Sequence, residues 1–237
     1  MRIKTFGMPE SAVNDRLAGV EAAHGVVIGY RAHFPEIEVK VLARAKTVEE
    51  AARISRAAAD EVKNRLGDTV YAEGDVDFMQ AVGALFRERS LTLATAESCT
   101  GGLVANLLTD HAGASDFFKG AVVAYDNVVK TGVLGVTTAL LTDKGAVSAE
   151  VARSMAEGAR RVLGTDFALS LTGIAGPGGA TPTKPVGLVH FAVASADGTT
   201  DRSVVFPGTR HQVRVMAAYA GMSLVRRVVL YGHGGDQ

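Results

Sequence analysis

The 237-residue chain has few cysteines, no net charge and no long apolar run, and each of these absences excludes a class of protein. It has a single cysteine, Cys99, so it cannot form an intrachain disulfide framework. Its 25 basic and 25 acidic side chains cancel, so no global field attracts nucleic acid or an anionic membrane. No apolar run has the length of a membrane-spanning helix, and the first residues lack the apolar stretch of a signal peptide. We therefore expect a cytoplasmic protein without a membrane partner.

The composition is that of an ordinary globular protein. Hydrophobic residues make up 47% and charged residues 21%, and the length allows a sizeable core without metal or disulfide support. The six histidines show no metal-ligand spacing, and they form no cluster with the cysteine. We expect neither a metal nor a cofactor.

Two domains are expected, residues 1–75 and 76–237. The first has the order βαββα(β) of a small α+β domain, and residues 67–77 are polar enough to be the linker and the cap of the next helix. Thr47 and Glu50 have the spacing of a capping box and open its second helix. We predict strands at 2–6, 25–33, 36–43 and 70–71, and helices at 10–23 and 47–65.

The second domain alternates strands with amphipathic helices. Its strands are nearly continuous apolar runs, which is typical of a sheet covered by helices on both faces. We therefore predict an α/β fold, a three-layer α/β/α sandwich. The predicted strands are 91–95, 120–125, 167–172, 186–195 and 202–206, and the predicted helices begin at 78 and span 100–109, 128–134, 138–144, 148–163 and 209–230.

The turn Glu-Ser-Cys-Thr-Gly-Gly at residues 97–102 joins a strand directly to a helix. Small residues and free helix amides at such a turn let a ligand approach the backbone. Ser98 is a candidate nucleophile, Thr100 a candidate cap, and the amides near Gly101 and Gly102 can hold an oxyanion or a phosphate. The turn is not a Walker loop. From spacing alone, an ordinary tight turn with Thr100 as its cap is the favoured interpretation.

Two further segments follow strands and can share an edge with this turn. Thr172 and Gly173 begin a glycine-rich loop, which lies at the ligand-binding edge if its strand is parallel to the one before Ser98, and is otherwise a flexible surface loop. Tyr125, Asn127 and Lys130 follow the strand Gly-Ala-Val-Val-Ala-Tyr. A buried lysine can act as a general base near neutral pH, whereas an isolated one is more often solvated.

Arg210 opens the last helix, where a positive charge opposes the helix dipole unless it binds an anion. It is therefore a candidate phosphate clamp, or else an exposed arginine that costs a few tenths of a kcal/mol. Cys99 is the rival nucleophile, although a lone cysteine without a neighbouring histidine is more often a small buried hydrophobe.

These motifs together resemble the C-terminal domain of the competence/damage-inducible CinA family, which also occurs alone as nicotinamide-nucleotide amidase. The stretches that carry the resemblance are residues 95–130, 145–148, 170–179, 184–192 and the Pro-Gly-Thr-Arg at 207–210. Residues 1–75 resemble the KH-like middle domain of the family. Full-length members begin with a molybdopterin-binding-like domain, which these 237 residues lack, and the sequence leaves open whether the chain is naturally short or a fragment.

The resemblance implies hydrolysis of the carboxamide of nicotinamide mononucleotide to nicotinate mononucleotide and ammonia. It implies a Ser98 nucleophile paired with Lys130. It also implies a nucleotide pocket lined by Ser115, Tyr125, Thr172 and Arg210, of which Tyr125 is also a catalytic candidate. It also implies a homodimer. The alternative is a module that binds the pyridine nucleotide without hydrolysing it. The KH-like segment has no G-x-x-G spacing, so we expect no specific binding to nucleic acid.

Overall fold

The computed structural model describes residues 1–234 and divides into two compact units, the first spanning Met1–Ala81 and the second running from Val82 onward. Helix α4 (Phe78–Glu88) crosses this division. Among the described residues, no helix is both long enough and apolar enough to cross a membrane.

The first unit is an antiparallel sheet in the order β2-β3-β1-β4. Its strands are β1 (Arg2–Thr5), β2 (Val26–His33), β3 (Glu36–Ala43) and β4 (Val70–Glu73). Helix α3 (Val48–Leu66) packs on this sheet, and its N-cap Thr47 accepts a hydrogen bond from the Glu50 amide as predicted. The turn η1 (Gly67–Thr69) leads into β4, so part of the predicted linker is a paired strand.

The single helix predicted at 10–23 is wrong. The structure has α1 (Glu10–Arg16) and α2 (Val20–His24), separated at Gly19, whose φ of 84° is left-handed and ends any right-handed helix. Both helices nevertheless contribute to one core, with Val13 and Val20 fully buried beside strand and α3 residues. The 3.6-residue periodicity therefore identified the buried face correctly but not the break.

The second unit contains a five-stranded mixed sheet in the order β6-β5-β7-β8-β9. The strands are β5 (Leu93–Glu97), β6 (Phe118–Val123), β7 (Phe167–Gly173), β8 (Leu188–Ser195) and β9 (Gly198–Val205). Strands β6, β5 and β7 are parallel, and β8 and β9 continue the sheet antiparallel. The carboxyl ends of β5, β6 and β7 therefore lie at one edge, as the prediction for Ser98 and Thr172 required.

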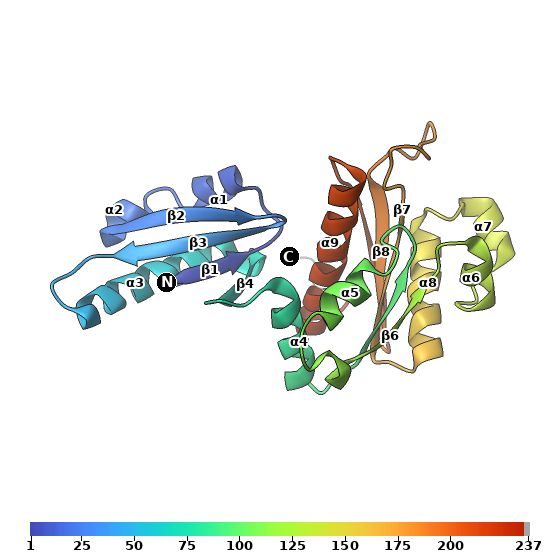
Figure 1. The fold of residues 1–237 in the computed structure, drawn as a ribbon, viewed down its shortest axis with the longest axis horizontal. Coiled ribbons are helices and arrows are strands. Elements are labelled where there is room, and N and C mark those ends of the chain that lie inside the picture. The colour runs from blue at the N-terminus through green and yellow to red at the C-terminus, as the bar shows by residue number, and fades with distance from the viewer. Residues whose placement is uncertain (235–237) are drawn as a thin grey trace. The chain divides into compact units, whose positions relative to one another are not determined.

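Helices cover both faces of this sheet, which confirms the three-layer α/β/α sandwich (Figure 1). Helix α8 (Ala149–Leu163) packs along one face, on which α6 (Asn127–Gly132) and α7 (Thr138–Lys144) also lie. Helices α5 (Leu103–Thr109) and α9 (Arg210–Tyr231) lie on the other face. Ser148 and Thr209 cap α8 and α9, and Thr209 forms a complete capping box with Gln212.

Several predicted boundaries in this unit are wrong. Strand β5 lies two residues later than predicted and so includes Glu97, β6 lies two residues earlier than predicted, and β8 begins at Leu188 rather than Val186. Strand β9 begins at Gly198 rather than Arg202. Helix α5 begins at Leu103 because Gly101 and Gly102 have left-handed φ angles of 59° and 90°, which a helix cannot contain.

Candidate functional site

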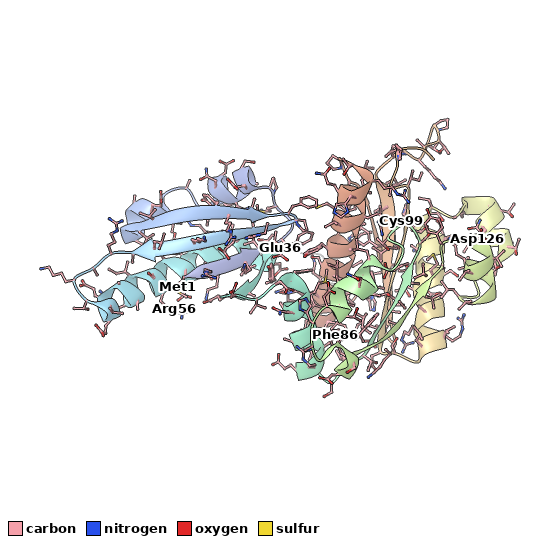
Figure 2. The ribbon with its side chains drawn as sticks, in the orientation of Figure 1. Met1, Glu36, Arg56, Phe86, Cys99 and Asp126 are labelled. Atoms are coloured by element: carbon pink, nitrogen blue, oxygen red, sulfur yellow. The ribbon has the colours of Figure 1, made fainter. Side chains whose placement is uncertain are left out.

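Three strand ends meet beside Ser98. The Ser98 amide donates to the carbonyl of Leu171 in β7 at 2.9 Å, and the Ala124 amide, just after β6, donates to the carbonyl of Glu97 at 2.8 Å. These two bonds place Ser98 between the segments that carry Tyr125 and Thr172. Figure 2 shows Cys99 in the turn after β5 and Asp126 at the start of α6 on this part of the unit.

The Ser98 turn is tightly built. Ser98 is 9% exposed, and its carbonyl accepts the Gly101 amide at 3.1 Å. Thr100 is not the helix cap, because the N-cap position belongs to Gly102 and the buried Thr100 hydroxyl has no hydrogen-bond partner. A left-handed Gly102 displaces the helix start beyond the reach of the Thr100 side chain, which explains the wrong prediction.

Glu97 occupies two amides of the first turn of α5, beyond the amides near Gly101 and Gly102 that were predicted to hold an anion. Its side chain is fully buried, and its two carboxylate oxygens accept the amides of Val104 at 3.1 Å and Ala105 at 2.9 Å. An internal carboxylate thus satisfies the N-terminus of α5 and matches its positive dipole end. Glu97 is not among the predicted site residues, because the strand was predicted to end at Thr95. The one available signal was an acidic residue directly before a glycine-rich helix start.

The remaining amides of the turn are candidate oxyanion donors. The amides of Cys99, Thr100 and Gly102 donate to no backbone carbonyl within the part of the chain that the structure describes, and those of Cys99 and Thr100 interact with the Cys99 sulfur. Donors fixed in advance around a developing negative charge are the usual means of stabilising the tetrahedral state of acyl transfer.

Lys130 is buried at the same edge, with 1% of its surface exposed. Its Nζ donates to the carbonyl of Ala124 at 2.8 Å and to that of Tyr125 at 3.3 Å. Burial lowers the pKa of Lys130, and the negative charge of Asp126 only partly opposes this effect. An uncharged amine that donates both of its hydrogens in this way keeps a lone pair that can accept a proton. No hydrogen bond joins Lys130 to Ser98 among the described residues.

Cys99 is a poor nucleophile in this setting. It is 7% exposed, and burial raises the pKa of its thiol to about 12, with the Glu97 carboxylate adding to the rise. Because the thiolate is the reactive form, the neighbouring serine is the better candidate.

Arg210 joins two of the predicted segments. Its Nη1 donates to the carbonyl of Gly176 in the loop after β7 at 2.8 Å, and its Nη2 donates to the Tyr125 hydroxyl at 3.2 Å. Tyr125 is 63% exposed, so this pair forms an accessible rim of the site. Two of the five guanidinium hydrogens are thus engaged, and the others remain for an anion.

The other predicted substrate-binding residues are less well placed to contact a ligand at Ser98. Thr172 is 1% exposed, and its hydroxyl donates to the carbonyl of Ala146 at 2.6 Å. Gly173 is required by packing, because a Cβ there would lie 2.6 Å from the carbonyl oxygen of Leu188. Asn127 lies on a cavity of about 350 Å³ between α6 and α7 that Ser98 does not line.

Ser115 does not join the group. It lies in the short turn η2 (Ala114–Asp116), just before β6, and Phe118 at the start of β6 pairs with Leu93 at the start of β5. Ser115 is therefore at the amino-terminal edge of the parallel strands, opposite Ser98. The family resemblance implied that Ser115 lines the pocket, but it did not indicate at which edge of the sheet Ser115 lies.

Comparison with known proteins relates both parts of the chain to one family. The sequence profile of the CinA C-terminal domain matches residues 75–229, and that of the damage-inducible protein CinA KH domain matches residues 2–72. A "CinA-like protein" of Geobacter sulfurreducens is 48% identical over 226 residues, which is 95% of this chain and 55% of that protein. One from Anaeromyxobacter dehalogenans is 45% identical over 228 residues. The chain thus spans about half the length of the curated relatives that it matches.

Solved structures match about two thirds of the chain. The competence/damage inducible protein CihA of Agrobacterium tumefaciens is 36% identical with a TM-score of 0.59, covering 65% of this chain and 98% of that one. A CinA superfamily protein of Klebsiella pneumoniae is 30% identical with a TM-score of 0.62, covering 63% and 94%.

Proposed function

The chain belongs to the CinA family, and on that premise we propose that it hydrolyses the carboxamide of nicotinamide mononucleotide to nicotinate mononucleotide and ammonia. The observation that carries this proposal is the buried Lys130 amine, with its lowered pKa, at the strand edge that also bears Ser98. A serine becomes a strong nucleophile only when a nearby base removes its proton, and a desolvated lysine can do so near neutral pH.

The proposed reaction is acyl transfer in two steps. Lys130 Nζ takes the Ser98 proton while Oγ attacks the carboxamide carbon, and the candidate oxyanion amides of the 99–102 turn stabilise the oxyanion. The C–N bond then breaks, and Lys130 returns the proton to the departing ammonia. Water attacks the resulting ester by the reverse use of the same base, which releases nicotinate mononucleotide and restores Ser98. The Lys130 amine and the Ser98 hydroxyl must come within hydrogen-bond distance when substrate is bound.

Release of ammonia from nicotinamide mononucleotide tests the proposal directly. We expect Ser98→Ala to lose turnover by several orders of magnitude while still binding the nucleotide. Cys99→Ala, at the adjacent position, is the matched control and should keep most of the activity. Wild-type turnover in Ser98→Ala would show that this serine is not the nucleophile.

Arg210 and Tyr125 are proposed to recognise the substrate at the rim. The guanidinium is held in place by Gly176 and Tyr125, and its remaining hydrogens can bind the 5′-phosphate. Arg210→Ala should weaken affinity for the nucleotide by about 10- to 100-fold, because a hydrogen bond to a charged group contributes about 1.5–3 kcal/mol. The riboside, which lacks the phosphate, should lose little. Equal losses for both compounds would contradict phosphate recognition.

A nucleotide-binding module without hydrolysis is the second candidate. The observation that favours it is the missing hydrogen bond between Lys130 and Ser98. Such a module would show a thermal shift with nicotinamide mononucleotide and release no ammonia, so the assay above separates the two functions.

A further inference from the structure

Arg214 on α9 holds the turn that carries Ser98, and we propose that it is a positioning residue for the Ser98 nucleophile. This inference rests on the proposed function. Neither the motifs nor the family resemblance pointed to Arg214, which lies 114 residues from its partner in the sequence.

The contact is short and made by a charged group. Arg214 Nη2 donates to the carbonyl oxygen of Thr100 at 2.6 Å, and the Leu103 amide donates to the same oxygen at 3.3 Å. Thr100 is fully buried, so little water competes for this carbonyl. Hydrogen bonds from charged donors are roughly twice as strong as neutral ones.

The peptide unit between Thr100 and Gly101 is therefore fixed at both ends. Arg214 holds its carbonyl, and its amide donates to the Ser98 carbonyl at 3.1 Å. A peptide is planar, so fixing both groups fixes the rotation of the whole unit. The left-handed Gly101 and Gly102 would otherwise allow the turn several conformations. Arg214 therefore supplies the one charged side-chain contact among the bonds that orient this turn, which carries Ser98 and the candidate oxyanion amides.

Arg214 acts from a rigid support that it shares with Arg210. The two arginines are four residues apart on α9 and so project from one face of the helix. Arg210 holds Tyr125 and Gly176 while Arg214 holds Thr100, so one helix face connects the segments after β5, β6 and β7. The capping box at Thr209 and the buried stripe of α9 keep this helix in place.

The test compares Arg214→Met with Arg160→Met. Arg160 is the matched control because its Nε also donates to a main-chain carbonyl, that of Asp166 at 3.1 Å, but at the amino-terminal end of β7. For nicotinamide mononucleotide we expect Arg214→Met to lower kcat by about 10- to 100-fold, the loss of one charge-assisted hydrogen bond, and to change KM by less than about threefold. Amide hydrogen exchange over residues 99–105 should accelerate in Arg214→Met and stay unchanged in Arg160→Met.

Each outcome either supports or overturns the proposed role of Arg214. Unchanged exchange over residues 99–105 in Arg214→Met would overturn the proposal, as would equal losses of kcat in the two variants or a loss confined to KM. Wild-type protein that releases no ammonia would refute the proposed function instead, and the exchange comparison would still show whether Arg214 holds the Ser98 turn.

Discussion

Replacing Glu97 by glutamine is expected to destabilise the second unit by about 2–4 kcal/mol. Glutamine has nearly the same size, but one of the two oxygens that accept the Val104 and Ala105 amides becomes an amino group, which cannot accept. Losing a hydrogen bond to a charged group costs about 1.5–3 kcal/mol, and leaving a buried donor unpaired adds about 1–3 kcal/mol. Removing a buried charge offsets part of this sum, because the carboxylate no longer has to be desolvated.

Thermal unfolding followed by circular dichroism measures this effect. For a unit of this size, the expected loss corresponds to a fall in Tm of about 5–15 °C. Glu49→Gln is the control, because Glu49 is also an acid near a helix N-terminus but is exposed on the first turn of α3, where its charge contributes about 0.3–1 kcal/mol. Equal stability losses in the two variants would refute the conclusion that the Glu97 carboxylate holds the start of α5.

Three further changes test other parts of the structure. Lys130→Met should abolish turnover. Burial lowers the pKa of Lys130 in the folded state, whereas the unfolded state keeps the ordinary value of about 10.4. Between these two pKa values the folded state binds fewer protons than the unfolded state. The stability of wild type relative to Lys130→Met should therefore rise with pH in that range. Urea titrations at several pH values check the sign, and a falling difference would contradict burial of the amine. Iodoacetamide should modify Cys99 slowly at neutral pH, as mass spectrometry would show, because its thiol has a pKa of about 12; rapid modification would indicate an accessible thiolate. Gly158→Ala should destabilise the protein by about 1–3 kcal/mol in thermal unfolding, because the new Cβ would lie 2.1 Å from the carbonyl oxygen of Leu134. Gly132→Ala, which meets no atom within 4 Å, is its control and should be neutral or stabilising.

Local patterns in the sequence determined the elements and their layers. Thr47, Ser148 and Thr209 each cap the helix that the sequence predicted, because a cap bonds to an amide only a few residues away. Apolar strands alternating with amphipathic helices predicted the sandwich, since a sheet buried on both faces needs both features. The Ser98 turn was also identifiable, because the glycines that allow it follow directly in the chain.

Only the tertiary structure decided how the site is assembled. The burial of Lys130, the Glu97 carboxylate on the amides of α5 and the Arg214 contact to Thr100 all depend on side-chain partners that no periodicity encodes. The position of Ser115 at the opposite edge likewise follows from strand direction and register, which pair residues distant in sequence. A local pattern specifies which backbone conformation a segment adopts. The pKa of a side chain and the partner of a carbonyl depend on what surrounds them after the chain has packed.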